Sequence, residues 1–206
     1  RILLLAEYYG MITHLDHEIG RVIDKLKEIG ELDNTLIVFT GDNGLALGCH
    51  GLMGKQNLYD HSVRIPLVLR GPGIPAGETR DQFVYLLDLF PTLCELNDLE
   101  VPDSVEGLSF APILADPSAE TRNSLYFAYN ELIRGVKDKR YKLIEYRTTV
   151  HKTQLFDLQE DPDELHDLSD LPEYEETLHR LRNLLFAYRD TWEAEHPYSQ
   201  AFWSNF

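Results

Sequence analysis

Two short apolar runs frame a long polar loop in the first third of the sequence, and this pattern constrains the fold more than any other feature. Thr35–Thr40 is an apolar, β-branched run, and Ile65–Leu69 is a second one. Such runs are typical of strands that are buried on both faces of an α/β sheet. The residues between them, 41–61, are polar and rich in glycine. Because ligands bind at the carboxyl ends of strands in open α/β sheets, we expect a ligand-binding site in this loop.

Amphipathic helices are predicted on both sides of this strand–loop–strand unit. From Tyr8 to Ile29, apolar residues recur every three or four positions, and Gly30 stands where a helix ends. A second pattern of this kind covers Leu86–Asn97. The order helix, strand, loop, strand, helix indicates an α/β domain.

The pattern changes at about Glu120, where short strand-like runs separated by turn residues begin. They predict an antiparallel meander with strands at Leu125–Tyr129, Leu132–Val136, Tyr141–Tyr146 and Gln154–Asp157. A final amphipathic helix is predicted over Tyr174–Trp192, and the apolar tail Tyr198–Phe206 is expected to pack on the body. We therefore predict that residues 1–120 are part of an α/β domain and that residues 121–206 form an antiparallel-sheet subdomain with a terminal helix.

Composition excludes some functions. The formal net charge of −16 would repel nucleic acid, so nucleic-acid binding is not expected. No apolar run approaches the roughly 20 residues that a membrane span needs. The two cysteines, Cys49 and Cys94, are too few for a disulfide framework. The chain begins at Arg1 inside an apolar segment, which we interpret as a cut, so a missing signal peptide says nothing about export.

A candidate metal site lies where the first apolar run ends. Asp42 and Asn43 follow that run directly, and a carboxylate beside an amide offers the hard oxygen ligands that Ca²⁺ or Mg²⁺ prefers. Gly41 and Gly44 leave the backbone free to turn both side chains toward one point. The alternative is an Asx-type turn that caps the strand.

Further along the loop, His50 and Lys55 are candidates for handling an anion. A lysine in a Gly-rich loop can place a point charge on a sulfuryl or phosphoryl oxygen. The alternative is a solvated lysine and a surface histidine. His61 and Arg64 precede the second apolar run, and we interpret them as structural or pocket-wall residues.

These residues together resemble the distal motif of the type I sulfatases, a family within the alkaline-phosphatase superfamily. The motif consists of an Asp-Asn-Gly after a strand, a Gly-x-His-Gly element, a lysine thirteen residues after the aspartate and an Ile-Pro strand. In this sequence its members are Asp42, Asn43, Gly44, His50, Gly51, Lys55, Ile65 and Pro66. The helix around Tyr8, the segments from Gly71 and Leu87, and the late segments from Arg140 and Leu155 also match, so the likeness covers nearly the whole chain. It implies an alkaline-phosphatase-like sandwich, with a central mostly parallel sheet between helices, plus a small C-terminal antiparallel sheet with a packed helix.

The resemblance also implies a site. Asp42 and Asn43 would be two ligands of a divalent cation, most often Ca²⁺ in this family, and Lys55 would contact the sulfate and the bridging ester oxygen. His50 would sit beside the site. The family nucleophile is a formylglycine made in a Cys/Ser-x-Pro-x-Arg motif, and the sequence contains no such motif. The nucleophile and the remaining ligands are expected in an N-terminal half of the same protein, so the chain alone is expected to be inactive.

The resemblance predicts a sulfuric ester hydrolase whose substrate is a sulfate ester. One alternative is a phosphonate or phosphate ester hydrolase of the same superfamily, and another is a non-catalytic binding or structural module. Neither the particular ester, the compartment nor the oligomeric state follows from the residues.

Overall fold

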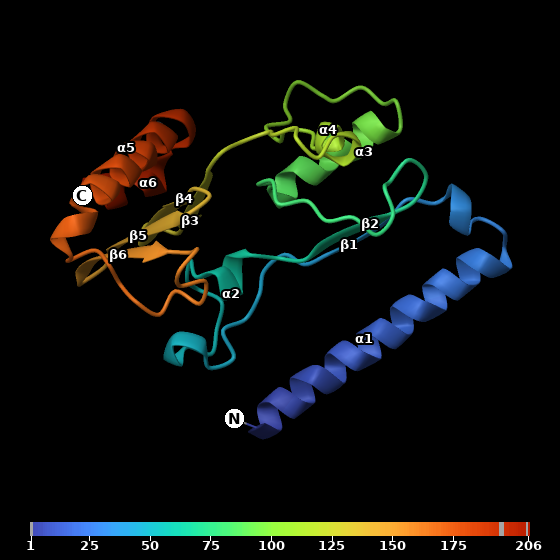
Figure 1. Cartoon of the computed structure of the whole chain (residues 1–206), viewed down its shortest axis with the longest axis horizontal. Coiled ribbons are helices and arrows are strands. Elements are labelled where there is room, and N and C mark those ends of the chain that lie inside the picture. Colours follow the sequence, from blue (N-terminus) through green and yellow to red (C-terminus); the bar gives the residue numbers. More distant parts are fainter. Residues whose placement is uncertain (1, 194–195, 205) are drawn as a thin grey trace.

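In a computed structural model, which describes residues 2–193, 196–204 and 206, the chain forms helices and two separate antiparallel sheets (Figure 1). The helices are α1 (Ile2–Glu28), α2 (Asp60–Val63), α3 (Leu89–Leu96), α4 (Ala111–Ala115), α5 (Glu175–Trp192) and α6 (Pro197–Trp203). The strands are β1 (Ile37–Thr40), β2 (Leu67–Arg70), β3 (Leu125–Tyr129), β4 (Ile133–Lys137), β5 (Tyr141–Arg147) and β6 (His151–Asp157). The mixed α/β class predicted from the sequence is confirmed.

Helix α1 begins earlier than its periodic pattern suggested and ends where it was predicted to end. Gly30 has a left-handed φ of 76°, and its N–H donates to the Lys27 carbonyl at 3.0 Å, which closes the last turn. None of the residues Ile2–Glu28 is buried, and α1 lies apart from the other helices in Figure 1. The apolar stripe of α1 is therefore open to solvent in this chain.

Strands β1 and β2 pair with each other antiparallel, and both are partly exposed. The prediction that they are buried on both faces is wrong for this chain. Phe39 pairs with Val68 across the ladder, and these residues are 40% and 58% exposed. The reason is that no other described strand pairs with either of them. The mostly parallel arrangement that the resemblance implies is likewise not visible within the described part of the chain.

The four strands β3 to β6 form the antiparallel meander that the sequence predicted, in the order β3-β4-β5-β6. Helix α5 covers one face of this sheet. Its Leu181 and Leu185 are fully buried against Leu143 and Leu155, where each large side chain contributes about 1.5–3 kcal/mol relative to exposure. A second apolar cluster on the sheet includes Leu58 and Tyr59, which come from the polar loop between β1 and β2, together with Ile133, Ile144 and Phe156. This second cluster attaches the loop to the sheet.

The apolar tail packs on the body, as predicted. Phe202 of α6 is fully buried beneath the Arg134 guanidinium, 4.9 Å from its ring centroid. Trp203 donates through Nε1 to a carboxylate oxygen of Glu193 at 2.8 Å. Residue 205, which falls within the predicted tail, lies outside the described residues.

A buried carboxylate joins the helical segment around α3 to the start of the meander. Asp88 is 0% exposed and accepts from the backbone N–H groups of Tyr85 and Leu108 at 2.6 and 2.9 Å. Arg122 Nη2 donates to Asp88 Oδ1 at 2.9 Å, and Arg122 Nη1 donates to Oδ2. The two predicted units are therefore connected by a paired buried charge as well as by the chain.

None of the helices in the described ranges combines the length and the apolar character that a membrane crossing requires.

Candidate functional site

The candidate site begins at the turn that follows β1. Asp42 is exposed, and its carboxylate makes no hydrogen bond or ion pair with any other residue that the structure describes. Asn43 is half-buried, and its Nδ2 donates to the Gly44 carbonyl at 3.0 Å. An Asx turn requires a side-chain oxygen that accepts from a backbone N–H, and neither Asp42 nor Asn43 makes such a bond among the described residues.

Lys55, which lies later in the same loop, contacts this turn. Its Nζ donates to Asn43 Oδ1 at 2.7 Å, and the side chain is exposed. The loop between them is held by backbone hydrogen bonds from Ala46 to Gly54 at 3.0 Å and from Gly48 to Leu52 at 2.7 Å. The structure thus brings together a cation and an amide that lie twelve residues apart in the sequence, and the amide belongs to the residue that follows Asp42.

Gly44 is required by close contact between the turn and α2. A Cβ atom at Gly44 would lie 2.0 Å from the His61 carbonyl oxygen, a distance that no side chain could tolerate. The Gly44 N–H donates to the Ser62 carbonyl at 2.9 Å. Glycine at this position therefore lets the Asp42–Asn43 turn lie directly on α2.

The structure places His50 against the C-terminal subdomain, whereas Lys55 contacts Asn43. His50 Nε2 lies 2.9 Å from the Glu164 carbonyl, and the imidazole stacks on the Tyr59 ring with centroids 3.9 Å apart. His61 lies close to both rings, with its ring centroid 5.3 Å from that of His50 and 5.6 Å from that of Tyr59. His50 has a left-handed φ of 53°, a conformation that is costly for a residue other than glycine and that tends to occur at functional sites.

The expectation that His61 is a structural or pocket-wall residue stays a prediction. Burial, together with the neighbouring His50 and the Lys142 ammonium, lowers the pKa of the His61 imidazole below its usual value. The neutral form is therefore favoured at this position.

Sequence reasoning missed a buried ionic cluster beneath the loop. Lys142 is 0% exposed, and its Nζ donates to Asp60 Oδ1 at 2.6 Å and to Glu164 Oε1 at 2.7 Å. Lys137 Nζ donates to Asp60 Oδ2 at 2.7 Å. Burial alone would raise the pKa of the Asp60 carboxyl, but the two lysines hold it below its usual range. No pattern in the sequence signals this cluster, because each member reads as an ordinary strand or turn residue.

The donor atoms at the turn suit a hard divalent cation as part of a larger ligand set. Asp42 offers a carboxylate that makes no hydrogen bond or ion pair within the described part of the chain, and the Asn43 amide oxygen accepts from Lys55. Ca²⁺ takes 6–8 oxygen ligands, so these two residues would supply only a share of them. Within the described ranges, no group of three His, Cys, Asp or Glu side chains is arranged to hold a metal.

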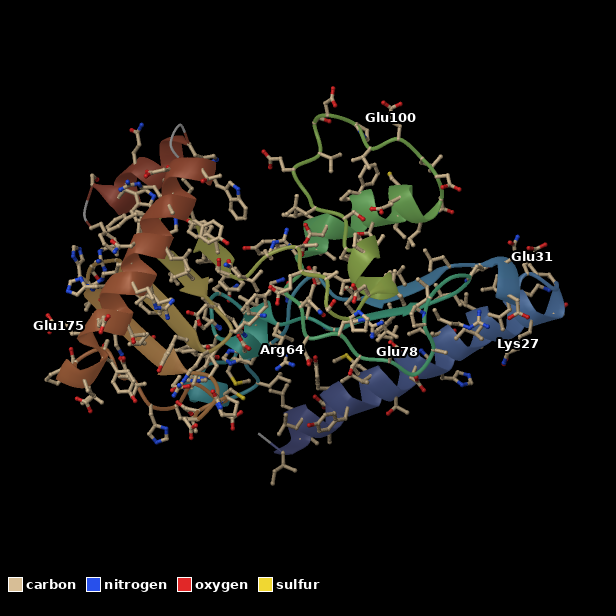
Figure 2. All side chains as sticks on the ribbon, turned by 45° about the horizontal axis from the view of Figure 1, so that its top comes forward. Lys27, Glu31, Arg64, Glu78, Glu100 and Glu175 are labelled. Carbon is tan, nitrogen blue, oxygen red and sulfur yellow. The ribbon has the colours of Figure 1, made fainter. Side chains whose placement is uncertain are left out.

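A groove of about 730 Å³ lies elsewhere, between the β1–β2 ribbon, the segment around residues 74–89 and the edge of the meander. Arg64 lines it, as expected for a pocket wall, and Figure 2 shows this side chain near the middle of the molecule. The lining does not include Asp42, Asn43, His50 or Lys55. The groove borders the loop at Thr40 and Asp60, but none of the four candidate site residues lines it.

Comparison with known proteins identifies relatives of the chain. The chain is 32% identical over 193 residues to an N-acetylglucosamine-6-O-sulfatase from Bacteroides thetaiotaomicron, with 88% of this chain and 35% of that protein covered. It superposes on the solved structure of BT4656, bound to its substrate D-glucosamine-2-N,6-O-disulfate, with a TM-score of 0.83 and 31% identity over 90% of this chain and 40% of that one. It also superposes on a phosphonate monoester hydrolase from Agrobacterium radiobacter with a TM-score of 0.79 and 30% identity, over 89% of this chain and 40% of that one.

The chain spans between about a third and two fifths of the length of these proteins. Residues 48–191 match the family model of N-sulphoglucosamine sulphohydrolase, C-terminal. The chain belongs to the type I sulfatase family, of which it is a C-terminal portion.

Proposed function

We propose that the protein containing this chain hydrolyses sulfate esters, and that this chain supplies half of the metal and sulfate site. The observation that carries the proposal is the 2.7 Å contact between Lys55 and Asn43, the residue next to Asp42, whose carboxylate makes no described contact. A cation and oxygen ligands at one strand end are what binding of a sulfuryl group beside a metal requires.

In this proposal, Asp42 and Asn43 are two ligands of a divalent cation, with Ca²⁺ the first candidate. When bound, the ion supplies Lewis-acid stabilisation of the charge on the group being transferred. Lys55 turns from Asn43 to the sulfate and holds its ammonium near the bridging ester oxygen, where negative charge develops as the ester bond breaks. His50 remains a prediction as a residue beside the site.

The rest of the site is proposed to come from an N-terminal half of the same protein. That half would carry the formylglycine nucleophile and the remaining metal ligands. It would also cover the exposed apolar stripe of α1 and the open face of β1 and β2, since exposed apolar patches of this kind mark sites of protein association.

A second candidate function is hydrolysis of phosphonate monoesters, and the similarity to the Agrobacterium enzyme favours it specifically. Both reactions transfer a tetrahedral group at a site that contains a metal ion and a cationic side chain. The residues of this chain therefore do not distinguish sulfate ester hydrolysis from phosphonate monoester hydrolysis. The test is turnover of an aryl sulfate and of an aryl phosphonate monoester by the full-length protein. A higher kcat/KM for the sulfate is expected, and a higher value for the phosphonate would replace the first proposal with the second.

A further inference from the structure

Glu164 is the centre of the contacts between the Gly-rich loop and the C-terminal sheet. Its side chain is 2% exposed, and its carboxylate is paired with the fully buried Lys142. Buried charges are costly unless each is paired and hydrogen-bonded. Because Asp60 and Lys137 complete the pairing, the cluster holds Glu164 in one position.

Glu164 contacts the loop at two separate places. Its Oε2 accepts from the backbone N–H of Asp60, the first residue of α2, at 2.6 Å. Its backbone carbonyl accepts from His50 Nε2 at 2.9 Å, and the imidazole must be the donor because a carbonyl can only accept. One residue therefore fixes both the outer part of the loop and the helix that follows the loop.

The backbone of Glu164 has a conformation that is strained for a residue with a side chain. Its φ is 57°, in the left-handed region where glycine is the least strained residue. Glycine would offer the same carbonyl to His50 but no carboxylate to Asp60 and Lys142. A glutamate in this conformation bears a cost that its other contacts must offset.

The contact at α2 leads directly to the candidate metal ligands. The His61 and Ser62 carbonyls of α2 touch Gly44, which follows Asn43. Because this contact leaves no room even for a Cβ atom, a shift of α2 must displace the turn that carries Asp42 and Asn43. At an active site, a misplacement of about 1 Å can cost about 100-fold in rate.

We propose that Glu164 is a positioning residue for the hydrolysis: through α2 and His50 it holds the loop that carries Asp42, Asn43 and Lys55. It acts without touching substrate. This inference rests on the proposed function for its effect on turnover, while its effect on the order of the loop is independent of any substrate.

The test compares Glu164→Ala, Glu164→Gln and the matched control Asp163→Asn in the full-length protein. Asp163 is the adjacent acidic residue, exposed and without a described ion pair. Both measurements are made at a temperature where each variant is folded. The first is kcat and KM on an aryl sulfate or a phosphonate monoester, whichever the wild type hydrolyses faster. The second is hydrogen exchange of the backbone amides in residues 44–63.

Glu164→Ala should lower kcat about 10–100-fold, the usual range for residues that support metal ligands, with a smaller change in KM. It should also accelerate exchange in residues 44–63. Glu164→Gln keeps the shape of the side chain and one acceptor oxygen, so its kcat and its amide exchange should lie between those of the wild type and Glu164→Ala. Asp163→Asn should match the wild type in both kcat and amide exchange.

Wild-type kcat and wild-type exchange in Glu164→Ala would overturn the inference, and so would faster exchange confined to the meander. If Glu164→Ala does not fold, Glu164→Gln alone decides, by a loss in both measurements or in neither. If the protein turns over neither ester, the proposed function fails and the exchange measurement still decides the role of Glu164.

Discussion

At the scale of single residues, Lys55 is the group whose surroundings argue most directly for chemistry. An exposed lysine usually forms at most a weak surface ion pair. Lys55 donates instead to the neutral Asn43 amide, while the nearby Asp42 carboxylate makes no described contact. A cation held beside oxygen ligands without neutralising them remains available to a bound anion.

We predict that Lys55→Ala in the full-length protein lowers kcat for sulfate ester hydrolysis by about 100–1,000-fold, the scale of losing one preorganised stabiliser of developing charge. The loss should be greatest for esters with poor leaving groups. A plot of kcat against leaving-group pKa for the wild type, Lys55→Ala and the exposed control Lys152→Ala checks this. Equal rates for Lys55→Ala and the wild type on all esters would return Lys55 to the role of a solvated loop lysine.

At the scale of elements, two buried ionic contacts connect parts of the chain that are distant in sequence. One joins Asp88 to Arg122, and the other joins Asp60 to Lys137 and Lys142. Removal of Arg122 would leave the Asp88 carboxylate without its cation, and removal of Asp60 would leave the Lys137 ammonium without its described ion-pair partner. Such an uncompensated charge inside the protein is more costly than the pair is stabilising.

Arg122→Met in the full-length protein is predicted to lower the free energy of unfolding by about 3–5 kcal/mol, because Asp88 would remain fully buried without its cation. Urea denaturation measures this. The double variant Asp88→Asn/Arg122→Met should lose less than the sum of the two single variants, because the charge that lacks a partner is gone. Strict additivity would show that the two side chains do not interact.

Asp60 should make the stability of the protein depend on pH in the acid range. Its pKa in the folded state lies below the ordinary 3.8, so between these two values the unfolded chain binds the extra proton. The stabilisation is therefore fully present above about pH 5 and is lost as the pH falls through the folded-state value. Urea denaturation between pH 3 and pH 6 should show the wild type exceeding Asp60→Asn most at the upper end. A difference between the two that stays constant with pH would contradict the assignment.

The elements themselves were largely predictable, because their signals are local. Each signal lies within a short stretch of the sequence. Examples are the repeat of apolar residues in α5, the glycine that ends α1 and the short strand-like runs of the meander. The half-site was predicted through the resemblance to the sulfatase motif, and the structure brings Asn43 of that motif to Lys55. The Glu164 cluster was not predictable, because burial of Lys142 depends on packing between segments that lie far apart in the sequence.

At the scale of the whole molecule, the apolar surface is distributed unevenly. The C-terminal meander has a closed core beneath α5, whereas α1 exposes Leu3, Tyr9, Met11 and Val22 by 63% or more. Strands β1 and β2 also present open edges to solvent, which favours association with other chains.

Residues 1–206 expressed alone should therefore associate or bind an apolar dye, and should unfold without one sharp transition. Sedimentation, dye fluorescence and calorimetry measure these properties. A soluble monomer of 23.8 kDa with a single cooperative transition and no dye binding would contradict the prediction and favour a stand-alone module.

If Asp42, Asn43 and Lys55 form half of a metal and sulfate site, a crystal structure of the full-length protein grown with Ca²⁺ should show them around the ion. We predict an Asp42 carboxylate oxygen about 2.3–2.6 Å from the ion, with Asn43 in the same ligand shell. An Asp42 side chain that caps β1 by a hydrogen bond, with Ca²⁺ bound at another site, would contradict it.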